Sequence, residues 1–164
     1  MDSQTALGYL NSQRHHVLGI LDGLDDEALR KPVLPSGWSC LGLVRHLAVD
    51  VERFWFLAVV GADQAVIDEF AASPDDGWLV DPGVPAKAVL DFYREQIDLA
   101  NAVIIATPLN EPPAWWPGDQ FGDWRMDDLH EIILHVMVET ACHAGHLDAV
   151  RELLDGRQWR VLTD

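Results

Sequence analysis

The chain has 164 residues, 49% of them hydrophobic, and 27 acidic residues against 11 Lys and Arg give it a formal net charge of −16. This length and apolar content predict one folded domain over residues 1–164 and exclude a disordered chain. The negative charge argues against nucleic acid or an anionic membrane as a partner, and no apolar run approaches the roughly 20 residues of a membrane-spanning helix.

Four amphipathic helical patterns are separated by segments rich in Pro, Gly and Asp. The first covers residues 3–24, with apolar side chains recurring at three- and four-residue steps. The second begins after Ser39, a predicted N-cap, and stops at Gly61, a predicted C-terminal glycine. A weaker pattern over 64–72 predicts a short extra helix before the Pro- and Gly-containing break at 74–83.

The remaining two patterns complete the predicted fold. The third begins near Pro85 and ends before Pro108, and a loop at 109–124 rich in Pro and Trp follows it. The fourth covers residues 127–155 and stops at Gly156. Since no stretch alternates like a strand, the sequence predicts an all-α antiparallel four-helix bundle.

Two polar side chains of the fourth helix, Glu139 and His143, fall in its apolar stripe. At about 100° per residue, both lie within or against the face that should contact the core. Burying a carboxylate and an imidazole is costly unless something compensates them. The two side chains could pair with each other as i, i+4 neighbours, pair with polar groups of another helix, or bind a metal ion.

The second helix offers a third ligand, His46, at the margin of its own stripe. One His from one helix and a Glu-x-x-x-His pair from another suit a divalent transition metal and leave positions open for water or substrate. Zinc and nickel suit these ligands, and manganese and iron stay open as alternatives. In the alternative interpretation, Glu139 and His143 satisfy each other and His46 is an ordinary boundary histidine.

Other polar and aromatic residues are candidates for supporting roles. His135 and His146 flank the apolar stripe, so we expect them beside the ligands or at the rim of a pocket. Trp115 and Trp116, in the loop at 109–124, either cover a pocket as a lid or pack onto the helices.

The two cysteines, Cys40 and Cys142, are too few for a disulfide framework. Cys142 is expected to be half-buried. Cys40 lies at the start of the second helix, where the helix dipole can lower a thiol pKa, so a reactive thiol is one interpretation. The first ten residues carry neither a basic start nor an apolar signal core, and we expect a cytoplasmic protein.

Two segments resemble the DinB/YfiT-like superfamily. Residues 36–39 (Ser-Gly-Trp-Ser) and 43–47 (Leu-Val-Arg-His-Leu) are similar to the start of its second helix. Residues 135–148 (His-Val-Met-Val-Glu-Thr-Ala-Cys-His-Ala-Gly-His-Leu-Asp) are similar to its fourth-helix signature, especially in the branch grouped with mycothiol-dependent maleylpyruvate isomerase.

The resemblance implies a four-helix bundle with a metal at one end of its core and His46, Glu139 and His143 as the three ligands. It also implies a low-molecular-weight thiol as cosubstrate and a homodimer. The sequence stops near the end of the fourth helix, without the further C-terminal domain of that isomerase, which counts against the isomerisation itself.

The leading hypothesis is a divalent-metal-dependent enzyme that uses a low-molecular-weight thiol on a small electrophile, as a thiol S-transferase or an isomerase-like enzyme. Metal coordination would deprotonate the thiol, which would attack an electrophile under the loop at 109–124, with His146 or His135 relaying protons. Two alternatives stay open. The same metal could activate water in a hydrolase, or the bundle could bind a small molecule without catalysis.

Overall fold

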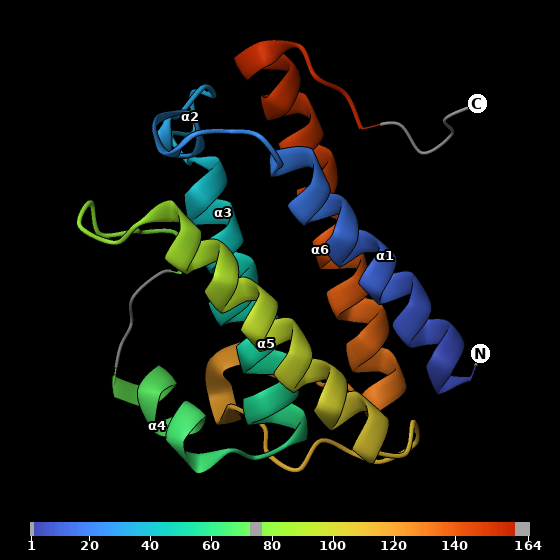
Figure 1. Ribbon diagram of the computed structural model, residues 1–164. Helices are drawn as coiled ribbons and strands as arrows, with labels where there is room; N and C mark the ends of the chain where they lie inside the picture. The colour runs from blue at the N-terminus through green and yellow to red at the C-terminus, as the bar shows by residue number, and fades with distance from the viewer. Residues whose placement is uncertain (1, 73–76, 160–164) are drawn as a thin grey trace.

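The computed structural model describes residues 2–72 and 77–159, and helices make up all the regular structure in these two ranges (Figure 1). In chain order the helical segments are α1 (Ser3–Leu21), α2 (Asp26–Arg30), α3 (Cys40–His46), the π-helix η1 (Leu47–Val60), α4 (Gln64–Ala72), α5 (Ala86–Ala106), the 3₁₀ helix η2 (Gly118–Phe121) and α6 (Leu129–Asp155). The prediction of an all-α chain is confirmed for the described residues.

The first helix is shorter than predicted. α1 begins at Ser3 as expected but ends at Leu21 instead of continuing to residue 24. The backbone leaves the helical conformation at Asp22, which has ψ 133°, and Gly23 follows with φ +81°, a left-handed conformation that glycine adopts without steric cost. The chain then forms α2, a short helix that periodicity did not predict, capped by the Asp25 carboxylate accepting from the backbone N–H of Ala28.

The second predicted helix changes its hydrogen bonding midway. Ser39 caps it as predicted, since its hydroxyl accepts from the backbone N–H of Gly42. The α-helical winding ends at His46, and π-helical winding continues to Val60. The helix stops at Gly61 as predicted, but Gly61 has φ −86° and is not a left-handed cap. Ala62, with φ +49°, adopts the left-handed conformation instead.

The later elements follow the sequence pattern closely. α4 covers the predicted residues 64–72, although residues 73–76 of the break after it lie outside the described ranges. α5 starts directly after Pro85 and ends before Pro108. α6 is capped at its start by the Asp128 side chain and at its end by Gly156, whose φ of +78° fits a left-handed glycine cap.

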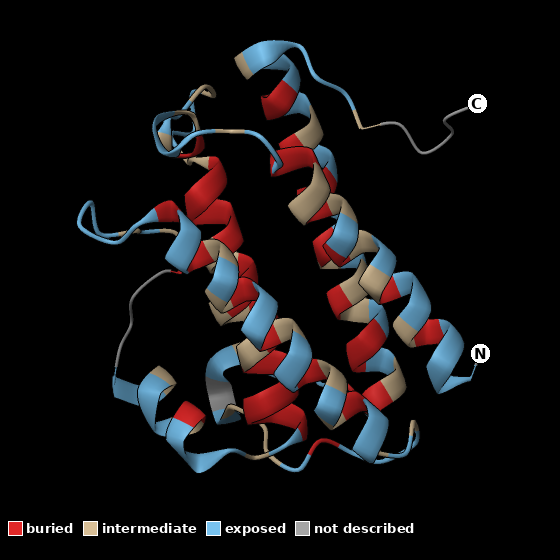
Figure 2. Cartoon of the chain, viewed as in Figure 1, coloured by how far each residue is buried: buried red, intermediate tan, exposed pale blue. Residues whose placement is uncertain are grey.

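The long helices pack in pairs around an apolar interior. α1 runs along α6, α5 runs along η1, and α3 touches both α5 and α6 (Figure 1). The residues coloured as buried lie mostly on the faces that these helices turn toward one another (Figure 2). Each large apolar side chain that is fully buried stabilises the fold by about 1.5–3 kcal/mol. The contact between α3 and α6 is what brings His46 next to the fourth-helix residues.

One ion pair lies inside this apolar interior. Arg14 of α1 donates to both carboxylate oxygens of Glu52 on η1, from Nε at 2.7 Å and from the second guanidinium nitrogen at 2.5 Å. Its remaining nitrogen donates to the side-chain oxygens of Asn11 and Asn101. Both Arg14 and Glu52 are almost completely buried. We call Arg14 and Glu52 the core ion pair.

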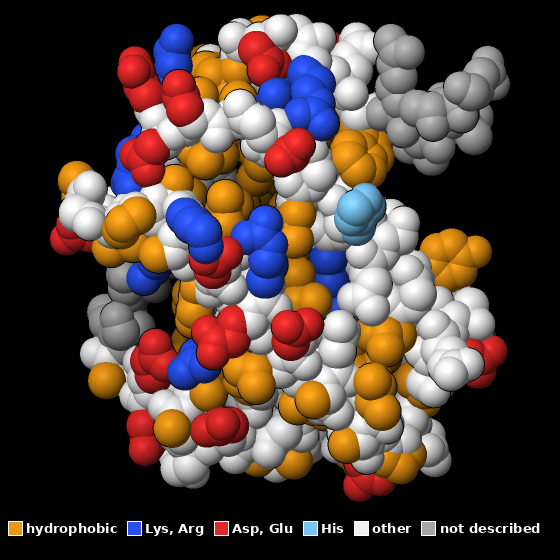
Figure 3. Space-filling view, viewed as in Figure 1, with side chains coloured by type: hydrophobic (Ala, Val, Ile, Leu, Met, Phe, Trp, Pro, Cys, Tyr) orange, Lys and Arg blue, Asp and Glu red, His pale blue; other side chains and the backbone are white. Residues whose placement is uncertain are grey.

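Most other charged side chains lie on the surface. Acidic and basic groups are interspersed over the face formed by α5 (Figure 3), where Asp91 pairs with both Lys87 and Arg94. Within the described residues, the length and hydropathy needed to cross a bilayer do not occur together in any helix.

Candidate metal centre

Three side chains from two helices converge between α3 and α6. His46 is the last residue of α3, and Glu139 and His143 are one turn apart on α6. Each offers one ligand atom, and these three atoms all lie within 4.8 Å of one another. His143 Nε2 lies 3.1 Å from Glu139 Oε1, and His46 Nε2 lies 3.8 Å from the same oxygen. We call these three residues the His-Glu-His cluster.

The cluster is closed on the histidine side and open on the carboxylate side. The side chains of His46 and His143 are only 15% and 11% exposed, whereas that of Glu139 is 39% exposed. Glu139 thus lies at the edge of the apolar stripe of α6, farther from its centre than the helical wheel indicated. A small molecule could reach the cluster from the side of Glu139.

The ring of His46 is oriented by a carboxylate. His46 Nδ1 lies 2.8 Å from Asp50 Oδ2, and the same oxygen accepts the backbone N–H of Gly77 at 3.1 Å. Because a carboxylate only accepts, Nδ1 carries the proton and Nε2 presents its lone pair toward Glu139 and His143. His46 Nε2 is buried and has no hydrogen-bond partner among the described residues.

An orphaned buried nitrogen is unusual and needs a physical explanation. Leaving such a group unsatisfied costs about 1–3 kcal/mol. A carboxylate that holds the opposite ring nitrogen is the arrangement typical of metal-binding histidines. The geometry of His46 therefore fits a metal ligand better than an ordinary boundary histidine.

His143 is held in the form that a metal ligand needs. Burial lowers the pKa of His143, the nearby His46 ring lowers it further, and Glu139 partly opposes both effects. Because its pKa is lowered, the imidazole of His143 is neutral near pH 7, and a neutral imidazole is the form that binds metals.

Trp78 covers one side of the cluster and Trp38 lies next to Trp78, and sequence reasoning did not select either as a site residue. The Trp78 indole stacks on the His46 ring with centroids 4.5 Å apart and an interplanar angle of 15°, and it meets the edge of His143 at 5.6 Å. The ring centroid of Trp38 lies 6.3 Å from that of Trp78 and 6.2 Å from that of His146. Trp38 lies in the 36–39 motif, but no sequence signal marks Trp78, which lies within the Pro- and Gly-containing segment at 74–83.

The two flanking histidines have different surroundings. His146 is exposed, and its Nδ1 lies 3.5 Å from His143 Nδ1, so it adjoins the cluster. His135 instead packs against Trp55 and Trp124, with ring centroids 4.9 and 5.5 Å away. Burial lowers the pKa of His135, and Glu139 partly opposes this.

The Trp-rich loop packs onto the helices and does not cover the cluster. Trp115 contacts Phe54 and donates its backbone N–H to the carbonyl of Val59, and Trp116 contacts Trp55. The indole that contacts the cluster residues is that of Trp78, which belongs to another loop, so the expectation of an electrophile under residues 109–124 is corrected. The aromatic wall next to the cluster is formed by Trp38 and Trp78.

The two cysteines lie in different environments. Cys142 is exposed, contrary to the expected half-buried position, because it lies on the outer face of α6. Cys40 is buried, and burial raises the pKa of its thiol to about 11. A thiol with that pKa stays protonated at neutral pH, so the helix dipole does not make Cys40 reactive.

The comparisons with known proteins identify a family for the chain. The family model described as MST, mycothiol-S-transferase, matches residues 5–156, which is nearly the whole chain. No curated protein matches the chain. The family match also confirms the resemblance to the DinB/YfiT-like superfamily. The chain belongs to the mycothiol S-transferase family.

Proposed function

We propose that this protein is a divalent-metal-dependent mycothiol S-transferase that joins the sulfur of the thiol to a small electrophile. Its metal ligands are His46, Glu139 and His143. The observation that carries the proposal is the lone pair of His46 Nε2, which is buried, has no partner in the described part of the chain and is turned toward the other two ligands by Asp50.

The donor set fits such an ion. Two imidazole nitrogens and one carboxylate are the ligands that zinc and nickel accept, and three protein ligands leave a position open. When bound, the cation would supply a positive charge that favours the deprotonated form of a nearby thiol.

The protein's own residues would set the geometry of the transfer. Asp50 fixes the ring of His46, and Trp78 shields that ring from water on one face. The open side at Glu139 leaves room for a reactant to approach the cluster. In the reaction the thiol loses its proton, the sulfur forms a bond to the electrophilic carbon, and the leaving group departs with its electron pair. His146, exposed beside His143, is placed to pass the thiol proton to solvent.

We also propose that the long helical segments form the antiparallel four-helix bundle of the DinB/YfiT-like superfamily. Its four members would be α1, α3 continued by η1, α5 and α6. The pairing of α1 with α6 and of α5 with η1 supports this arrangement. The cluster would then lie between two neighbouring members of the bundle.

The metal is tested first by elemental analysis of tag-free protein purified without chelator. We expect about one zinc or nickel ion per chain, and loss of that ion in His143→Ala with the helical circular dichroism spectrum retained. Unaltered metal content and affinity in His143→Ala would remove His143 from the ligand set.

Turnover separates the transferase from a hydrolase. The metal-loaded protein is incubated with a chloronitroarene, with and without mycothiol, and release of chloride is measured. Thiol transfer requires mycothiol for turnover and gives the thioether as product. Turnover that proceeds equally without any thiol would contradict the proposal and favour activation of water.

A further inference from the structure

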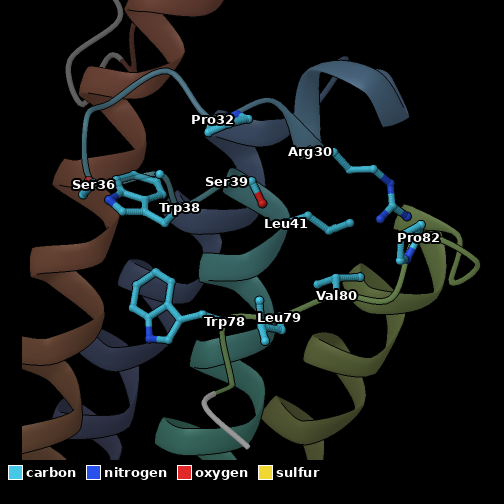
Figure 4. Close-up of a pocket in the computed structure, with 11 residues that line it drawn as sticks. Arg30, Pro32, Ser36, Trp38, Ser39, Leu41, Trp78, Leu79, Val80 and Pro82 are labelled. Atoms are coloured by element: carbon cyan, nitrogen blue, oxygen red, sulfur yellow. The ribbon is translucent and has the colours of Figure 1, made fainter.

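A groove begins at the aromatic wall of the His-Glu-His cluster and extends away from it. Its volume is about 610 Å³, within the range of sites that hold small organic ligands. The residues that line it come from the segment before α3, from the first turn of α3 and from residues 78–82. In Figure 4, Trp38 and Trp78 lie on the α6 side of α3, and Arg30, Val80 and Pro82 lie on the other side. We call this the indole groove.

The indole groove and the cluster share a wall. Trp78 lines the groove and also stacks on His46, and Trp38 lines the groove and faces His146. A ligand held against these two indoles would therefore lie next to the cluster. Two other pockets, with volumes of about 540 and 410 Å³, are lined by neither Trp38 nor Trp78.

The wall that carries Trp78 is held tightly in place. The backbone N–H of Gly77 donates to Asp50, and a Cβ at Gly77 would lie only 2.2 Å from the Asp50 carboxylate. On α3, a Cβ at Gly42 would lie 2.5 Å from the carbonyl oxygen of Trp78. The two glycines thus allow residues 77 and 78 to press against α3, and the same Asp50 orients both His46 and the groove wall.

The lining is mostly apolar and adds two serine hydroxyl groups, so it favours a neutral ligand with apolar faces and some hydroxyl groups. Indole faces pack well against the C–H faces of sugar-like rings, and Ser36 and Ser39 add hydroxyl groups. The charge of Arg30, which lines the far part of the groove, is already engaged by Asp26 and by the carbonyl of Val84. With a net charge of −16 on the chain, an anionic ligand would gain little from this groove.

We propose that the indole groove binds the carbohydrate part of the thiol cosubstrate, with Trp38 as its stacking platform. This proposal rests on the proposed function, because mycothiol is a cysteine-based thiol that carries a glucosamine–inositol unit. The groove would select this thiol over simpler thiols by contacts made away from the sulfur. The electrophile would then approach from the open side at Glu139.

The test measures binding of three probes to the protein as purified by isothermal titration calorimetry. The probes are mycothiol, N-acetylcysteine, which lacks the sugar, and the sulfur-free glucosamine–inositol unit. We expect mycothiol to bind at least about tenfold more tightly than N-acetylcysteine, and the sulfur-free unit to bind measurably. In Trp38→Ala both sugar-containing probes should weaken about tenfold, while Trp38→Phe should retain most of their affinity.

A matched control is Trp159→Ala. Trp159 stacks on His16 and does not line the groove, so its loss should leave all three affinities unchanged. Equal affinities for mycothiol and N-acetylcysteine in the wild type, or equal effects of the Trp38 and Trp159 substitutions, would overturn the proposal. If the sulfur-free unit does not bind but mycothiol is still transferred, the groove assignment fails and the proposed function stands. If that unit binds in the Trp38-dependent way but no thiol is transferred, the groove assignment stands and the proposed function fails.

Discussion

The core ion pair and the His-Glu-His cluster both place ionisable side chains between helices, but they complete their hydrogen bonds differently. In the core ion pair, Arg14 donates to both oxygens of Glu52 and to two asparagines, so the two charges satisfy each other inside the chain. In the cluster, His46 Nε2 has no partner within residues 2–72 and 77–159.

This difference separates a structural role from a functional one. A buried charge that the fold pairs with its own donors holds helices in register but has no capacity left for a ligand. A buried lone pair that the fold orients but does not hydrogen-bond lowers the stability of the fold and contributes no contact in exchange. A cation bound in the cluster would satisfy this lone pair and so explain why the fold tolerates it.

The largest expected effect is on the core ion pair. Replacing Glu52 with Ala leaves the Arg14 charge buried without its main partner and should lower the free energy of unfolding by about 3–5 kcal/mol. Urea unfolding followed by circular dichroism measures this, with Glu69→Ala as the control. Glu69 pairs with Arg53 on the surface, and its loss should cost no more than about 1 kcal/mol. Equal costs for the two substitutions would show that the core ion pair is not structural.

Metal-linked stabilisation should appear in the cluster alone. Zinc at about 100 times its dissociation constant should stabilise the wild type by about 2.7 kcal/mol, because it binds the folded chain only. The same gain is expected in Glu52→Gln, which leaves the cluster intact, and no gain is expected in His46→Phe. Thermal unfolding with and without zinc measures all three. A full gain in His46→Phe would exclude His46 as a ligand.

A smaller effect is expected at Asp50, which hydrogen-bonds to His46 and is not itself one of the proposed metal ligands. Asp50→Asn removes the charge that holds the His46 ring and should weaken zinc binding about 10–100-fold. Asp68→Asn, an exposed substitution on α4, serves as the control and should leave affinity unchanged. Competition with a chromogenic chelator gives both constants. An Asp50 variant that binds zinc like the wild type would mean that the carboxylate only anchors Gly77.

The sequence was sufficient for much of the fold because local signals agree there with the tertiary structure. Ser39 and Gly156 cap helices as their residue types predict, and α4 and α5 follow their apolar periodicity. The π-helix was missed because apolar side chains at nearly every position of η1 fit more than one helical period. The early end of α1 depended on the backbone conformations of Asp22 and Gly23, which periodicity does not report.

The site was predictable where its residues lie on helices and unpredictable where they lie on loops. His46, Glu139 and His143 were selected because each interrupts or borders an apolar stripe. Asp50 could have been found as well, since it lies one turn after His46 on the same helix. Trp78 could not, because its stacking on His46 depends on a long-range contact made by a loop.

A further, smaller effect concerns pH in the metal-free protein. Burial lowers the pKa of His143, so below pH of about 6.5 the unfolded chain binds a proton that the folded chain resists. Stability should therefore be fully present above that pH and decline as the pH falls through the lowered pKa of the folded state. Melting temperatures of the metal-free wild type and His143→Gln at pH 7.5 and 5.5 test this. The same decline in both proteins would assign it to other groups.

The smallest effect is expected at Tyr93, which lies near the core ion pair. Like His46, it has a buried polar atom without a hydrogen-bond partner among the described residues. Its hydroxyl is buried and lacks a hydrogen-bond partner in the described part of the chain, and burial, together with Glu52, raises its pKa well above the usual value. Tyr93→Phe removes this hydroxyl without removing the ring, so the free energy of unfolding should stay the same or rise by up to about 1 kcal/mol. Tyr9→Phe, on the exposed surface of α1, is the control, and metal affinity should not change in either variant.

A loss of more than about 1 kcal/mol of unfolding free energy in Tyr93→Phe would mean that an ordered water hydrogen-bonds to this hydroxyl. An unsatisfied atom would then be no guide to function by itself, and the case for His46 would rest on the carboxylate that orients it.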